Sequence, residues 1–169
     1  QVDLESTGFT TPDAIFVQSC LSSLKRRNCS AVAMEVSSHA LSQSRVAAVN
    51  FKAAIFTNLS RDHLDFHGDM HSYAAAKRIL FDAQGLVCAV INVDDATGSE
   101  MIRSLNKNLQ IISCSTRNNA ADVHVKNIRC SMSGTQADVF TPWGRGLIQT
   151  CLIGEFNLNN LLLVLSAIV

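Results

Sequence analysis

Short apolar runs and amphipathic stretches alternate along the first two thirds of this chain. Four apolar runs end in polar residues, as buried strands of a parallel sheet do; they are residues 31–36, 53–58, 88–93 and 110–115. Helical periodicity marks three further stretches, residues 10–28, 72–83 and 98–108. This alternation predicts an α/β fold with a mostly parallel sheet flanked by helices.

Polar residues at the expected helix starts indicate how two of the helices begin. Thr11 is expected to cap the first helix, with Pro12 in the first turn and Asp13 near the positive end of the helix dipole. Ser72 is expected to cap the helix at 72–83.

The pattern changes near residue 120. Three segments alternate like strands with one exposed face: 122–130, 135–140 and 146–153. They predict a small antiparallel meander, and a helix is expected from residue 157 to 169. The chain is therefore expected to divide into a parallel α/β part at 1–119, a meander at 120–153 and the start of a helix at 154–169.

Composition and charge narrow the class of protein. The 169 residues suit about one domain, and 14 Lys and Arg residues balance 14 Asp and Glu residues, so no basic excess favours nucleic acid or an anionic membrane. The apolar runs are too short for a membrane-spanning helix of about 20 residues. The 6 cysteines form no CxxC pair, which indicates buried thiols in a reducing, cytoplasmic compartment.

Polar side chains follow three of the expected strands. They are residues 35–39 after the first apolar run, Thr57 and Asn58 after the second, and Asn92, Asp94 and Asp95 after the third. In open parallel sheets, ligands bind beyond the carboxyl ends of the strands. These residues therefore predict a binding cleft at that edge of the sheet.

The segment SRDHLDFHGDMH, residues 60–71, holds three histidines four residues apart: His63, His67 and His71. On a helix, this spacing would place all three on one face. Gly68 makes a continuous helix unfavourable, and no HExxH motif occurs. On these residues alone, both a tri-histidine zinc site and a loop with mostly solvent-facing histidines remain open.

Lys77 lies on the apolar side of the helix expected at 72–83. Such a lysine usually extends its amine to the surface. Burial, in contrast, lowers the pKa of an amine, and a neutral amine can add carbon dioxide to give a carbamate. The carbamate oxygens would suit a hard cation, and the residues alone do not choose between the two roles.

Six strings occur in an order that one family shares: TTPDA, AMEVSSHAL, FTNLSRDHLDFHG, YAAAKRILF, INVDD and GEFNLNN. They resemble the central domain of the Mur ligases, most closely the members that add the third amino acid of the peptidoglycan peptide. The motifs cover the chain from residue 10 to about 160, and EVSSHAL followed by TNLSRDHLDFHG is highly specific.

The resemblance implies an ATP-dependent amide ligase of the bacterial cytoplasm. ATP would phosphorylate the γ-carboxylate of D-glutamate in UDP-N-acetylmuramoyl-L-Ala-D-Glu (UDP-MurNAc-L-Ala-D-Glu). The amine of a diamino acid would then attack the acyl phosphate, and Mg²⁺ would neutralise charge on the phosphoryl group. The full-length form would be a monomer that binds no nucleic acid and inserts into no membrane.

The resemblance also implies a catalytic group around the metal. Glu35, His63 and Lys77 would hold Mg²⁺, with Lys77 carbamylated by CO₂. Asp62 and Asp65 would orient His63 through hydrogen bonds. The other two histidines, His67 and His71, would be loop residues.

Further residues match the family's substrate and nucleotide contacts. The residues expected to bind the UDP-muramoyl dipeptide are Thr10, Thr11, Ser37, Gln43 and Arg45. Asn157 and Asn160 are expected to lie near the adenine of ATP. Phe9 stands where some members have asparagine, so that one contact is not carried over.

The chain contains no G-x-x-x-x-G-K-[ST] phosphate loop. Family members carry this loop on the first strand of the domain, between an N-terminal uridine-binding domain and a C-terminal domain for the incoming amino acid. The chain is thus expected to be a partial central ATPase domain that is inactive alone. The alternatives are another Mur ligase with a different acceptor, a metallohydrolase using the three histidines, and a nucleotide-binding module of an assembly.

Overall fold

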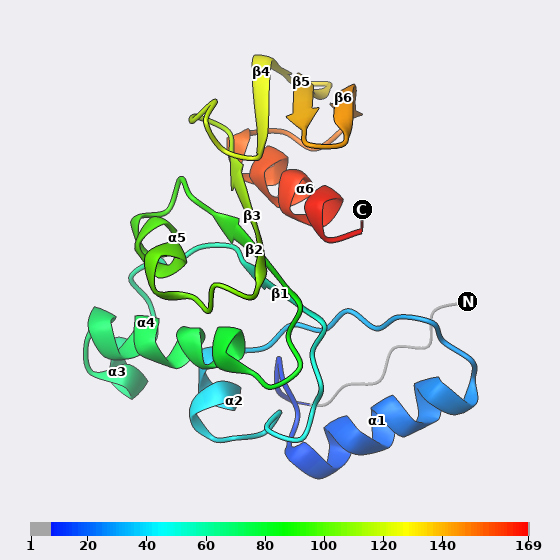
Figure 1. Cartoon of the computed structure of the whole chain (residues 1–169), viewed down its shortest axis with the longest axis vertical. Helices are drawn as coiled ribbons and strands as arrows, with labels where there is room; N and C mark the ends of the chain where they lie inside the picture. The colour runs from blue at the N-terminus through cyan, green and yellow to red at the C-terminus, as the bar shows by residue number, and fades with distance from the viewer. Residues whose placement is uncertain (1–7, 169) are drawn as a thin grey trace. The chain divides into compact units, whose positions relative to one another are not determined.

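Six strands form one sheet in the order β1-β2-β3-β4-β5-β6, so strands adjacent in the sequence are adjacent in space (Figure 1). The strands are β1 (Ala53–Phe56), β2 (Cys88–Asn92), β3 (Gln110–Ser115), β4 (Val123–Ser131), β5 (Gly134–Thr141) and β6 (Gly144–Thr150). β1 through β4 pair in parallel, and β4 through β6 pair antiparallel. The expected mixed α/β sheet with a C-terminal meander is confirmed.

This computed structural model describes residues 8–168, which form two compact units. The first unit contains the described residues up to Asn50 together with Arg61–Gln84, and the second contains Phe51–Ser60 together with the described residues from Gly85 onward. Within the described part of the chain, no helix has the length and apolar character needed to cross a membrane. The division expected at residues 119 and 153 stays a prediction.

The first unit is helical. Its elements are α1 (Ala14–Arg26), α2 (Ser38–Ser42), α3 (Leu64–His67), α4 (Met70–Arg78) and a 3₁₀ turn at Ile79–Asp82. Two expected caps are wrong. Asp13 rather than Thr11 caps α1, and Asp69 rather than Ser72 caps α4. In both cases an ionised carboxylate, a stronger acceptor than a hydroxyl, takes the exposed backbone N–H groups at the helix start.

The strand expected at residues 31–36 is absent from the structure, which shows irregular backbone there. Its apolar composition is that of a buried strand, but Val32 is 48% exposed. A strand requires a neighbour for its hydrogen bonds, and the sheet begins at β1. The Glu35 carbonyl accepts a hydrogen bond from the Thr11 hydroxyl instead of a strand partner.

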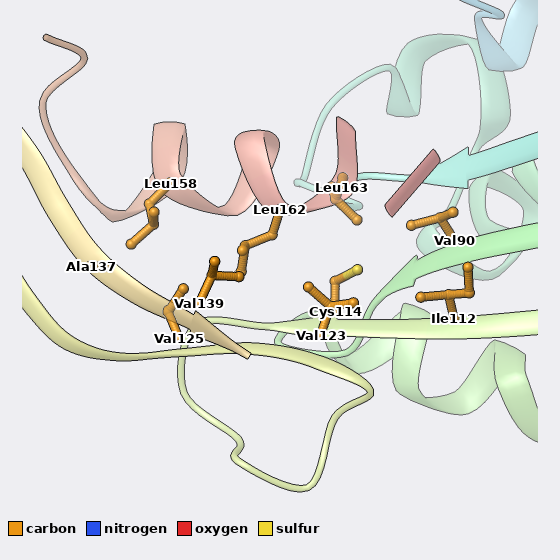
Figure 2. Packing of buried hydrophobic residues seen from close by; sticks show 10 residues of the cluster. All are labelled: Val90, Ile112, Cys114, Val123, Val125, Ala137, Val139, Leu158, Leu162 and Leu163. Atoms are coloured by element: carbon orange, nitrogen blue, oxygen red, sulfur yellow. The ribbon is translucent and has the colours of Figure 1, made fainter. Parts of the chain in front are cut away.

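The second unit holds the sheet, α5 (Ala96–Met101) with a 3₁₀ turn at Ile102–Ser104, and α6 (Glu155–Ile168). Asp95 caps α5, so this helix starts before the expected residue 98. One face of α6 packs on the sheet and excludes water from the core (Figure 2). The core residues are Val90, Ile112, Cys114, Val123, Val125, Ala137, Val139, Leu158, Leu162 and Leu163.

Candidate functional site

A buried threonine organises the segment that follows α1 and precedes α2. Thr11 is 1% exposed. Its hydroxyl donates to the Glu35 carbonyl at 3.0 Å and accepts from the Ser37 N–H at 2.9 Å. Ser37 in turn caps α2, accepting from the Ala40 N–H. Thr11 therefore fixes the backbone that presents Glu35 and Ser37, and its own hydroxyl is engaged within the protein.

Arg45 is held by Thr11 and by Gln43. Its Nη1 donates to the Thr11 carbonyl at 2.8 Å, and its Nε donates to Gln43 Oε1 at 2.8 Å. The guanidinium carbon lies 4.9 Å from the centre of the Phe9 ring, a cation–π arrangement. The structure thus brings together Thr11, Gln43 and Arg45, and Phe9 contacts Arg45 through its ring.

We predict that Thr11→Val lowers the stability of the protein by about 1–3 kcal/mol, because it leaves the Glu35 carbonyl and the Ser37 N–H without their buried partner. For a chain of this size the melting temperature should fall by roughly 2–4 °C per kcal/mol. Thr11→Ser, which keeps the hydroxyl, is the matched control and should lose less. Calorimetry showing equal melting temperatures for Thr11→Val and the wild type would refute the proposed hydrogen-bond role.

His63 precedes α3 in a left-handed backbone conformation, with φ of 55°. Its N–H donates to the Asp62 carboxylate at 2.7 Å, and the same carboxylate lies 3.6 Å from its ring Nδ1. Asp62 therefore holds the backbone of His63, and its proposed role in orienting the His63 ring stays a prediction. Asp65 lies in the first turn of α3, and its proposed bond to His63 stays a prediction.

The histidines do not share one helix face. α3 is a single turn that ends at His67 and is followed by Gly68, where φ is +81°. His71 follows in α4 as an exposed residue. Among residues 8–168, no three or more His, Cys, Asp or Glu side chains are placed to hold a metal. The described residues therefore give the tri-histidine zinc site no support.

His67 is not the solvent-facing loop residue that the sequence suggested. It is half-buried, its Nε2 lies 2.8 Å from the Ser38 hydroxyl, and its ring stacks on Tyr73 with centres 4.8 Å apart. Burial first, and then the nearby rings of His39 and His63, hold the pKa of His67 below its usual value. The neutral ring is thereby favoured.

Lys77 lies one turn after Tyr73 on α4 and is half-buried. Its Nζ is 5.4 Å from the centre of the Tyr73 ring. The His63 ring meets the same tyrosine edge-on at 5.9 Å. Tyr73, which is 5% exposed, thus places Lys77 and His63 beside one ring, and Glu35 lies exposed in the same unit.

In the second unit, polar residues gather where β2 and β3 end and α6 begins. The Asp94 carboxylate accepts from the Thr116 N–H at 2.7 Å, and Asn159 of α6 donates to Asp94 at 3.3 Å. The Thr116 hydroxyl lies 2.8 Å from both Asp94 and Glu155. The hydrogen bond from Arg117, followed by that from Thr116, lowers the pKa of Glu155. This network anchors the start of α6.

The two asparagines expected near adenine lie in the first half of α6. Asn157 donates through Nδ2 to the Ile153 carbonyl at 2.9 Å, and Asn160 is half-buried. Asn159, which the family motif does not single out, makes the contacts to Asn92 and Asp94. Asn159 holds α6 through its contact with Asn92 at the end of β2. These two residues are far apart in the sequence, so no short motif predicts the contact.

The family model for the Mur ligase middle domain matches residues 1–168, and the chain belongs to the Mur ligase family. A UDP-N-acetylmuramoyl-L-alanyl-D-glutamate–2,6-diaminopimelate ligase of Pseudomonas aeruginosa is 47% identical over 165 residues, covering 98% of this chain and 34% of that protein.

Other relatives agree. The ligase of the same name from Coxiella burnetii is 44% identical over 170 residues, covering 98% of this chain and 35% of that protein. A solved structure of a ligase with this name superposes with a TM-score of 0.86 at 34% identity, covering 92% of this chain and 32% of that one. MurF from Acinetobacter baumannii, at 21% identity and a TM-score of 0.63 over 73% of this chain and 26% of that one, shares the fold. The chain spans about a third of the length of the curated relatives it matches.

Proposed function

We propose that this chain is the middle domain of an ATP-dependent ligase that adds a diamino acid to UDP-MurNAc-L-Ala-D-Glu in peptidoglycan synthesis. The relatives at 47% and 44% identity carry the name of the 2,6-diaminopimelate ligase, which favours that diamino acid over lysine. The observation that carries the proposal is the convergence of Lys77 and His63 on the Tyr73 ring.

The proposed reaction has two steps. A γ-carboxylate oxygen of D-glutamate attacks the terminal phosphorus of ATP, so that an acyl phosphate forms and ADP leaves. The amine of the diamino acid then attacks the acyl carbon, the carbon–oxygen bond to phosphate breaks, and the amine loses a proton. Most of the catalysis in such a reaction is positioning and charge neutralisation.

The dipeptide substrate is proposed to bind at the segment between α1 and α2 whose backbone Thr11 fixes. Arg45 is a suitable partner for an anionic oxygen because a guanidinium donates in a planar fork, and its contacts to Thr11 and Gln43 hold that fork in place. Thr10, which precedes Thr11 in the sequence, and Ser37, whose N–H donates to the Thr11 hydroxyl, complete the proposed set. Thr11 would act through the backbone it fixes, because its hydroxyl is already engaged.

Mg²⁺ is proposed to be held by Glu35, His63 and a carbamate on Lys77. A hard cation prefers oxygen ligands, and Glu35 is the only unmodified oxygen donor of the three. Addition of CO₂ to the Lys77 amine would give the proposed set two further oxygens, the ligand type that Mg²⁺ prefers. The bound ion would supply positive charge for the phosphoryl oxygens.

ATP is proposed to bind with its adenine near Asn157 and Asn160, whose amides can both donate and accept. The network of Asp94, Thr116 and Glu155 would keep this end of α6 in place for the nucleotide. Since ATP and UDP-linked precursors are cytoplasmic metabolites, the reaction is assigned to the bacterial cytoplasm, with the full-length ligase as a monomer.

We predict that the 169-residue chain alone releases no phosphate from ATP, because it contains no phosphate loop of the G-x-x-x-x-G-K-[ST] type. A full-length ligase containing it should release phosphate only when UDP-MurNAc-L-Ala-D-Glu and the diamino acid are both present. A colorimetric phosphate assay on both proteins tests the proposal. Magnesium-dependent release by the isolated chain, or release by the full-length protein without the dipeptide substrate, would count against it.

A further inference from the structure

His67 connects three helices of the first unit. It is the last residue of α3, and its Nε2 lies 2.8 Å from the hydroxyl of Ser38, the first residue of α2. Its ring stacks at 4.8 Å and an interplanar angle of 13° on Tyr73 of α4. α4 contacts both α2 and α3, and the three helices lie together in Figure 1. One side chain therefore links all three helices through a hydrogen bond and an aromatic stack.

The partners of His67 are fixed within the protein. Ser38 is 3% exposed and Tyr73 is 5% exposed. The Ser38 side chain also hydrogen-bonds Tyr73, so loss of His67 would remove one of the partners of a buried hydroxyl, which costs free energy. The stacked pair of His67 and Tyr73 adds attraction beyond its buried area. The position of the Tyr73 ring therefore depends both on its stack with His67 and on the packing of α4.

Tyr73 is also the ring beside which two of the three proposed metal residues lie. Lys77 Nζ is 5.4 Å from its centre, and the His63 ring is 5.9 Å away and edge-on. The short turn α3 additionally joins His63 to His67, since the His67 N–H donates to the His63 carbonyl at 3.0 Å. A shift of His67 would thus change the positions of both Lys77 and His63.

We propose that His67 is a positioning residue for the ligation reaction. Its hydrogen bond to Ser38 and its stack on Tyr73 set the places of Lys77 and His63. The inference rests on the proposed function of this site, and it replaces the view of His67 as a loop residue. It assigns His67 no contact with substrate and no proton transfer.

The test compares four variants of a full-length ligase containing this chain. His67→Ala removes both contacts, His67→Phe keeps an aromatic face without the hydrogen bond, and His67→Gln keeps a donor and acceptor without the ring. His71→Ala is the matched control, because His71 is exposed and four residues further along the same segment. Groups that orient ligands of a metal typically contribute about 10–100-fold to activity or metal affinity.

We expect kcat to fall about 10–100-fold in His67→Ala and the Mg²⁺ concentration for half-maximal rate to rise. The KM for ATP should change little, His67→Gln and His67→Phe should each recover part of the loss, and His71→Ala should match the wild type. The second readout is independent of turnover: in ¹³C-bicarbonate, the carbamate carbon of Lys77 should give a weaker NMR signal in His67→Ala than in the wild type.

The proposal is overturned if His67→Ala keeps wild-type kcat, Mg²⁺ dependence and carbamate signal, or if its only change is a lower melting temperature. If His67→Ala does not fold, His67→Gln decides, and wild-type kcat together with a wild-type carbamate signal in that variant overturns the proposal. Failure of the proposed function is distinguishable, because then the wild-type ligase itself would form no amide product.

Discussion

Lys77→Ala in a full-length ligase containing this chain is expected to lower kcat by about 10²–10³-fold, the size of effect seen when a group that stabilises transition-state charge is removed. The variant cannot form the carbamate, so Glu35 and His63 would be left as two ligands for a cation that prefers more oxygens. Lys77 is half-buried beside Tyr73, so removal of its side chain leaves space near that ring. Steady-state kinetics with saturating substrates measures the effect.

Two comparisons make this result specific. Lys107→Ala, which removes an exposed lysine of the other unit, should leave kcat at the wild-type value. Millimolar formate or acetate should partly restore Lys77→Ala, because a free carboxylate can supply the missing oxygens. Near-normal turnover of Lys77→Ala without added carboxylate would show that the assigned role of Lys77 is wrong.

Leu162→Ala is expected to lower the free energy of unfolding by about 2–5 kcal/mol, as truncations of buried leucines do. Leu162 is fully buried on the face of α6 that covers the sheet (Figure 2). Its neighbours Val125, Val139 and Leu158 belong to the same core, and their backbone positions are tied to the sheet and to α6. The cavity would therefore be filled only in part. Urea unfolding followed by circular dichroism gives the difference.

The same helix offers a matched control for this measurement. Val164 is 53% exposed on the other side of α6, and Val164→Ala should change the free energy of unfolding by no more than about 0.5 kcal/mol. Equal urea midpoints for Leu162→Ala and Val164→Ala would contradict the packing of α6 on the sheet as described.

The central strands could be predicted because their composition leaves few alternatives. Residues 110–115 form β3 over the whole expected range, and 88–93 and 53–58 contain β2 and β1. The run at 31–36 has the same apolar character but forms no strand. The composition of a segment indicates whether it can be buried. A strand also needs a neighbouring strand for its N–H and C=O groups, and the sequence pattern does not identify that neighbour.

The site was only partly predictable for a related reason. Family motifs single out Thr11, Arg45 and Lys77, and the structure gives each a defined neighbour. They do not single out Tyr73, although an aromatic residue four positions before a lysine lies on the same helix face. The role of His67 could not be found from its spacing, because its partner Ser38 is 29 residues away along the chain.

Ligation through an acyl phosphate would transfer one oxygen of the substrate carboxylate to the released phosphate, and isotope labelling detects this transfer. UDP-MurNAc-L-Ala-D-Glu carrying ¹⁸O in the γ-carboxylate is incubated with ATP, Mg²⁺, diaminopimelate and the full-length ligase, and the released phosphate is analysed by mass spectrometry. We expect amide product and phosphate that carries one oxygen from the carboxylate. Unlabelled phosphate, or phosphate release without amide product, would contradict it.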